Sequence, residues 1–108
     1  MAYDENLANR VRDLLEGEPG LVEKKMFGGL GFILDGNMAV GVSGDALMVR
    51  LPADDEGAPA EPGVRPFEVG GRSMKGWLLI DPPGHEKAKD LRRWVGRGTT
   101  FARTLPPK

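Results

Sequence analysis

Basic side chains recur along one side of the last helical segment of the sequence. At about 100° per residue, Lys89, Arg92, Arg93 and Arg97 (the basic stripe) lie opposite the apolar residues of that segment. Residues 85–108 hold seven lysines and arginines against two acidic residues, whereas the rest of the chain holds eight against fourteen. A stripe of this kind binds phosphate backbones, and it is also typical of a solvated helix face paired with acidic residues such as Asp54, Asp55 and Glu56. Both interpretations stay open.

A glycine run and a lysine–tryptophan pair are the next residues with chemical potential. Residues 28–31 (GGLG) resemble half of a phosphate-cradling loop, but a helix must follow such a loop and here a strand is expected. In residues 74–77 (MKGW), a cation beside an aromatic ring suits an anionic or stacked ligand, whereas the alternation of Trp77 with Leu79 is typical of a core strand. The hypothesis of a ligand or interface site rests on Lys25, Phe27, Gly28, Gly29, Lys75 and Trp77.

The sequence offers few groups for catalysis or metal binding. It has no cysteine, which excludes disulfides, thiolate nucleophiles and cysteine-based zinc sites, and His85 is its single histidine. We interpret His85 as a surface or cap residue, and Ser43 and Ser73 have no acid–base partner visible in the sequence. The acidic run at residues 54–56 lacks calcium-loop spacing. We therefore expect no metal, no cofactor and no catalytic residue, and predict that the protein is not an enzyme.

The segments that position these residues alternate between helical and extended periodicity. A helix is expected over 4–15 with Asp4 as its N-cap, and a second helix over 85–103, where Gly96 and Gly98 mark a kink or a close neighbour. Extended segments are expected at 22–27, 30–34, 38–42, 46–51, 66–69 and 75–80, with Met38, Val40 and Val42 on one side of theirs. Their short connections impose antiparallel pairing, and residues 52–63 form an acidic surface loop between two halves of the sheet.

Length and composition favour one domain over residues 1–108. The chain has 40% hydrophobic and 29% charged residues and a formal net charge of −1, which is ordinary for a globular protein. The fold class expected is α+β, with an antiparallel sheet of about five strands and a helix at each end of the chain. No apolar run approaches about 18 residues, and the polar N-terminus is unlike a secretory signal. We expect no membrane span and a cytoplasmic location.

Four motifs follow one another in a characteristic order. They are KMFGGLGF at residues 25–32, NMAVGV at 37–42, LMVR at 47–50 and MKGW at 74–77. Together with the opening YDENLANRVRDLL, they resemble the N-terminal domain of the TfoX/Sxy family, named after bacterial regulators of natural competence. The resemblance covers nearly the whole chain and implies a stand-alone domain with a two-layer, secretion-chaperone-like fold. The resemblance supplies no catalytic residues. The full-length competence regulators carry a second, C-terminal domain, and the chain is expected to depart from them in this respect.

Three functional hypotheses follow from these patterns. The first is a small non-catalytic binding or regulatory module that acts through protein–protein interaction, with a protein partner or a second copy of the chain. The second is weak nucleic-acid binding through the basic stripe, as part of transcriptional regulation. The third is a small-ligand or enzyme site near Lys25, Gly28, Gly29 and Lys75, which requires a concave pocket joining those residues.

Overall fold

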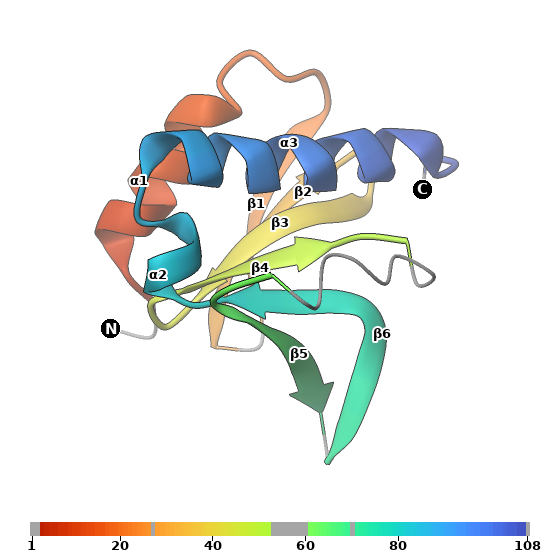
Figure 1. Cartoon of the computed structure of the whole chain (residues 1–108). Helices are drawn as coiled ribbons and strands as arrows, with labels where there is room; N and C mark the ends of the chain where they lie inside the picture. The colour runs from red at the N-terminus through yellow and green to blue at the C-terminus, as the bar shows by residue number, and fades with distance from the viewer. Residues whose placement is uncertain (1–2, 27, 53–60, 70, 108) are drawn as a thin grey trace.

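The chain folds into one antiparallel sheet with its helices at the two ends of the sequence (Figure 1). The computed structural model describes residues 3–26, 28–52, 61–69 and 71–107. The sheet has six described strands in the order β1-β2-β3-β4-β6-β5. The α+β class is confirmed, with six strands where about five were expected. In chain order the elements are α1 (Glu5–Leu14), β1 (Leu21–Met26), β2 (Gly29–Leu34), β3 (Asn37–Ser43), β4 (Ala46–Arg50), β5 (Val64–Val69), β6 (Arg72–Ile80), α2 (Pro82–His85) and α3 (Ala88–Thr104).

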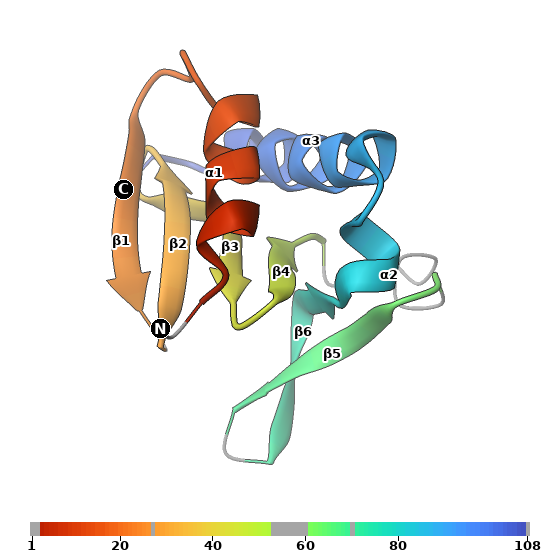
Figure 2. The same ribbon diagram turned by 90° about the vertical axis from the view of Figure 1, so that its left-hand side faces the viewer.

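Helices α1 and α3 cover one face of the sheet, and the main core lies between the two layers (Figures 1 and 2). Leu7 and Val11 of α1 and Trp94 of α3 are each at most 1% exposed. They pack on inward-facing residues of the four central strands, such as Phe32 and Val49. Burial of this apolar surface is the main stabilising contribution to the fold.

The N-terminal helix forms where its capping residue predicts. The Asp4 carboxylate accepts hydrogen bonds from the backbone N–H groups of Asn6 at 2.9 Å and Leu7 at 3.2 Å. On the outer side of α1, Arg12 donates to both oxygens of Glu23 in β1, at 2.6 and 2.7 Å. This hydrogen bond lowers the pKa of Glu23, against a smaller opposing effect of desolvation. The ion pair ties α1 to the edge strand.

The strand β3 does not alternate as predicted, because it contains a bulge. Phe32 pairs with Val40 and Ile33 pairs with Met38, so Ala39 is an extra residue on β3. Val40 therefore faces the helices, whereas Met38 joins a second cluster on the opposite face of the sheet. The prediction that Met38 and Val40 share one side was wrong for this reason.

The second cluster occupies the face of the sheet that the helices leave uncovered. Leu47, Val49, Leu78 and Ile80 belong to the main core, so the intervening residues of β4 and β6 point the other way. The cluster contains buried Met38, Ala46, Met48 and Leu79, with Ile33, Phe67 and Trp77 packed against it. Trp77 is thus a half-buried member of this second cluster.

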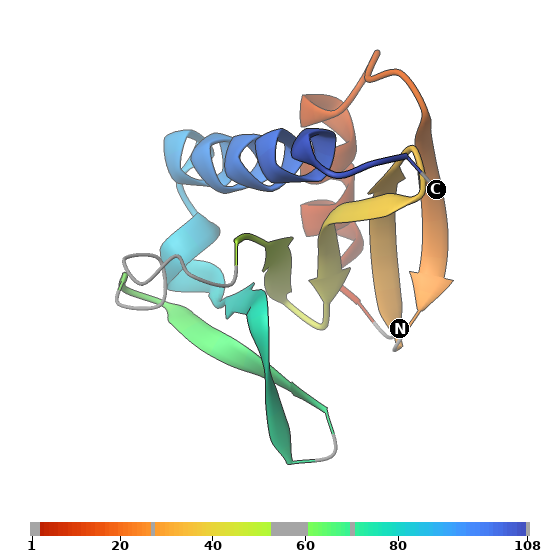
Figure 3. The same cartoon turned by 90° about the vertical axis from the view of Figure 1, so that its right-hand side faces the viewer.

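The β5–β6 hairpin extends beyond the main sheet (Figure 3). Strand β6 passes through Gly76 with φ +83°, a conformation that glycine adopts without steric cost. The N–H of Leu51 donates to the Gly76 carbonyl at 2.7 Å, where the alignment of β4 with β6 ends. Nearer the turn, Ser73 and Arg72 pair with residues of β5. The glycine sets the direction in which the hairpin leaves the sheet.

The C-terminal helical region consists of two helices rather than the single helix predicted over 85–103. Helix α2 begins at Pro82, a residue favoured at helix starts, and α3 begins at Ala88 after an extended Lys87. His85 is 5% exposed, and its Nε2 lies 2.8 Å from the Asp45 carbonyl oxygen. Of the two alternatives given for His85, the surface position was wrong, because the turn before β4 packs on α2. His85 is the last residue of α2, next to the C-cap Glu86.

A candidate binding groove on helix α3

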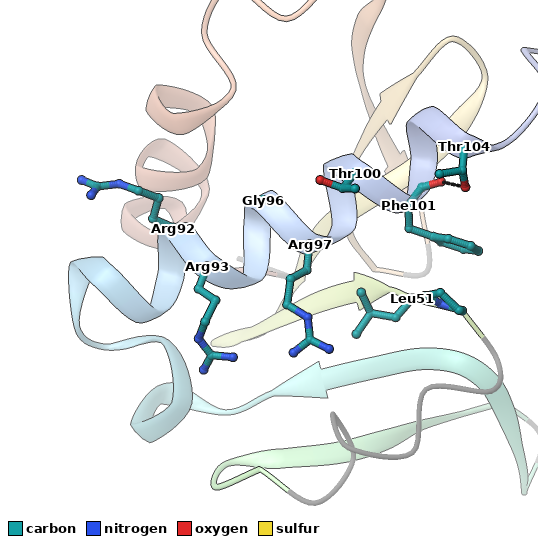
Figure 4. Close-up of a pocket in the computed structure, with 9 residues that line it drawn as sticks. Leu51, Arg92, Arg93, Gly96, Arg97, Thr100, Phe101 and Thr104 are labelled. Atoms are coloured by element: carbon teal, nitrogen blue, oxygen red, sulfur yellow. Dashed lines mark hydrogen bonds between the residues drawn. The ribbon is translucent and has the colours of Figure 1, made fainter.

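A groove of about 510 Å³ runs between α3 and the end of β4 (Figure 4). One wall is the exposed side of α3 between Arg92 and Thr104, and the other is formed by Leu51 and Pro52. Leu51 and Phe101 supply apolar surface to this α3 groove. Gly96 also lines the groove and has no side chain to fill it. A Cβ at this position would have no neighbour within 4 Å, so the position faces open space.

Two arginines of the basic stripe meet one carboxylate at the groove. Arg93 and Arg97 are one helical turn apart and point from α3 toward the sheet (Figure 4). Arg93 Nη1 lies 2.9 Å from one oxygen of Glu61, and Arg97 Nη1 lies 3.0 Å from the other. Glu61 lies shortly before β5, near the end of the segment that the sequence analysis expected to be an acidic loop. A carboxylate that bridges two guanidinium groups makes charge-assisted hydrogen bonds to both.

The same two arginines are held by the ring of Trp94. Their guanidinium carbons lie 4.8 Å and 4.9 Å from the ring centroid, within the range of cation–π attraction. Trp94 is 1% exposed, so its ring is part of the core and forms a rigid base beneath both side chains. Arg93 and Arg97 are therefore positioned by the core as well as by Glu61.

The other two members of the basic stripe are not part of the arginine pair that meets Glu61. Lys89 and Arg92 are exposed, and no ion pair is seen for either within the described ranges. Figure 4 shows Arg92 directed away from the sheet. Asp90, on the same helix, lies 3.9 Å from Arg93. The residues Asp54, Asp55 and Glu56, proposed as partners of the stripe, lie outside the described residues.

A third arginine, Arg50, stands next to the groove between two aromatic rings. Its guanidinium carbon lies 5.2 Å from the Trp77 ring centroid and 5.7 Å from that of Phe101, which lines the groove. The sequence analysis paired Trp77 with Lys75 and missed Arg50. No signal in the sequence predicted this contact, because Arg50 becomes the cross-strand neighbour of Trp77 only through the pairing of β4 with β6.

The six residues of the other predicted site do not share one location. Lys25 is on edge strand β1 and Lys75 is on β6, and three strands of the sheet lie between β1 and β6. At the usual strand spacing this separation is about 19 Å. Phe27 lies outside the described residues.

The glycine run has a structural explanation. Gly28 adopts φ +74° in the turn between β1 and β2, and a Cβ on Gly29 would collide with the Val42 carbonyl. Gly29 therefore permits the close approach of β2 to β3. This arrangement agrees with the interpretation of the run as a tight turn.

Two further features bear on the chemistry of the chain. No cluster of three or more histidine and acidic residues capable of holding a metal ion occurs in the described ranges. No helix in the part of the chain that the structure describes has the length and apolar character needed to cross a membrane.

Comparison with protein-family models decides the family. The model of the TfoX N-terminal domain matches residues 13–102, which is most of the chain. The chain belongs to the TfoX N-terminal domain family. The match includes the end of β4, Glu61 and α3 as far as Ala102, so the arginines of the groove and the Glu61 carboxylate that pairs with them are part of this TfoX N-terminal domain. Neither the curated proteins nor the solved structures gave a match.

Proposed function

We propose that this TfoX N-terminal domain is a small non-catalytic binding module that acts through protein–protein contact, with the α3 groove as its docking surface. The observation that carries the proposal is the combination of apolar surface, from Leu51 and Phe101, with arginines fixed in place by Trp94. Arginine and aromatic side chains are enriched at the energetic centres of protein interfaces. Side chains already ordered before binding lose less conformational entropy when a partner docks.

The polar groups of the groove support binding better than catalysis. The Thr104 hydroxyl donates to the Phe101 carbonyl at 2.6 Å, which commits its proton within the helix. Thr100 is exposed on the groove wall. The one imidazole of the chain is buried against the Asp45 carbonyl oxygen rather than lining the groove. A nucleophilic mechanism requires a base within hydrogen-bond reach of the hydroxyl, and this arrangement favours a binding role.

Filling the groove tests the proposal. Thr100→Trp places a bulky ring at an exposed position of the groove wall, and Asn6→Trp places the same ring at an exposed position of α1. The probe is a fluorescein-labelled synthetic peptide rich in glutamate and leucine, titrated by anisotropy. We expect Thr100→Trp to weaken binding about tenfold or more, equivalent to about 1.4 kcal/mol, with no change for Asn6→Trp. Equal affinities for wild type and both variants would refute the groove as the docking surface.

Nucleic acid is the second candidate ligand, supported by the exposure of Lys89 and Arg92. Against it, Glu61 and Asp90 place negative charge beside Arg93. Duplex and single-stranded DNA titrated at low and near-physiological salt distinguish the two candidates, because phosphate contacts weaken steeply as salt rises. DNA binding that survives salt and is lost in Lys89→Glu/Arg92→Glu would favour this candidate.

A further inference from the structure

Arg93 and Arg97 in the α3 groove already bind a carboxylate, and that carboxylate belongs to Glu61 of the same chain. We propose that Glu61 is an internal competitor, and that the partner of the groove is an acidic protein segment whose carboxylate takes its place on Arg93 and Arg97. This inference rests on the proposed function of the groove as a docking surface.

The geometry of Glu61 defines what the incoming group must be. Each carboxylate oxygen meets a different guanidinium group, at 2.9 and 3.0 Å. A glutamate or aspartate from another chain forms the same two charge-assisted hydrogen bonds when it occupies this position. Phe101, in the same groove, is half-buried and provides apolar surface for a neighbouring side chain of that segment, beside Leu51, which is 4% exposed. An acidic segment that also carries leucine-like residues therefore matches both parts of the groove.

Two observations make Glu61 exchangeable. The side chains of Glu61 and Arg93 are 30% and 44% exposed, and ion pairs at such sites contribute little to stability. The ring of Trp94 continues to hold Arg93 and Arg97 when the carboxylate leaves, so the site stays formed.

The test compares two variants that remove one negative charge each. Glu61→Gln removes the competitor, whereas Asp90→Asn removes a charge 3.9 Å from Arg93 that bridges no arginine pair. The probes are the labelled glutamate- and leucine-rich peptide and an analogue in which glutamine replaces every glutamate. We expect Glu61→Gln to bind the acidic peptide about twofold to fivefold more tightly than wild type. Asp90→Asn should gain less, and the glutamine peptide should show no gain.

A direct readout accompanies the affinities. The side-chain Nε–H signals of Arg93 and Arg97, followed by nuclear magnetic resonance, should shift when the acidic peptide is added to wild type. The same peptide should leave the signal of Arg103, which pairs with Glu18 and Asp35, unchanged. Thermal melts of both variants establish that each is folded before binding is compared.

The outcomes separate this inference from the proposed function. Peptide binding that Glu61→Gln leaves unchanged or weakens would refute the internal competitor and leave the docking surface in place. Equal gains in affinity for Glu61→Gln and Asp90→Asn would also refute it, since the gain would then come from removing any negative charge near α3. A gain for duplex DNA equal to that for the peptide would refute an acidic segment as the partner. Absence of peptide binding to wild type and to Glu61→Gln would overturn both proposals.

Discussion

Two glycines in α3, two residues apart, should respond in opposite directions to the same substitution. A Cβ on Gly98 would stand 2.5 Å from the Ala39 carbonyl oxygen and 2.8 Å from a methyl carbon of Val40, whereas a Cβ on Gly96 meets nothing within 4 Å. Alanine is favoured over glycine in a helix interior by roughly 1 kcal/mol. Gly96→Ala should therefore stabilise the domain by up to about 1 kcal/mol.

For Gly98→Ala the same gain is opposed by a collision with backbone. Non-bonded carbon atoms sit comfortably at about 3.5–4.0 Å, so α3 must move away from β3 by about 1 Å. Forcing an extra carbon into a packed core costs about 1–3 kcal/mol. Gly98→Ala should thus be about 1–3 kcal/mol less stable than Gly96→Ala.

Urea denaturation of the wild type and the two variants measures the difference directly. Thermal melts should separate the two variants by at least about 4 °C, given the unfolding entropy of a domain of this size. Equal stabilisation by both substitutions would refute the reasoning, because it would mean that α3 does not approach β3 at Gly98. Equal destabilisation would mean that the helix is not formed around Gly96.

Four further substitutions test other parts of the structure. Trp94→Ala should cost about 3–5 kcal/mol in unfolding free energy, whereas Arg93→Ala should cost about 1 kcal/mol or less, both measured by urea denaturation. The hydrogen bond from Arg12 lowers the pKa of Glu23, so its contribution is present above pH 4.5 and is lost as the pH falls through the lowered value. Glu23→Gln should flatten the acid side of the stability–pH curve by at most about 1 kcal/mol, since both side chains are partly exposed. Gly76→Ala should destabilise the hairpin by about 1–2 kcal/mol in thermal melts, because alanine resists a positive φ.

The elements that the sequence predicted well are those decided by neighbouring residues. The cap at Asp4 and the apolar spacing of α1 are local, and both are found. The turn between β2 and β3 is also local, with Asp35 at φ +50° and Gly36 at φ +86°, as a tight hairpin requires. Short connections of this type also predicted that the consecutive strands from β1 to β4 pair antiparallel, as they do.

The features that escaped prediction depend on contacts between distant segments. The bulge at Ala39 contacts α3 at Gly98, which lies 59 positions later in the chain. The spacing of residues within β3 alone carries no information on such a contact. Arg50 meets Trp77 because β4 pairs with β6 and not with β5, the next strand in the sequence. His85 is buried because the Asp45 carbonyl accepts its ring hydrogen bond.

The basic stripe shows how the fold selects among residues that are equivalent in sequence. Helical spacing places Lys89, Arg92, Arg93 and Arg97 on one side of α3, and charge alone does not separate them. The crossing of α3 over the sheet, close enough at Gly98 to exclude a methyl group, turns Trp94 into the core. That orientation brings only Arg93 and Arg97 over the Trp94 ring and within reach of Glu61. On the proposed function, a partner of the α3 groove would meet two positioned arginines beside an apolar surface, an arrangement that would select for the position of a carboxylate as well as for its charge.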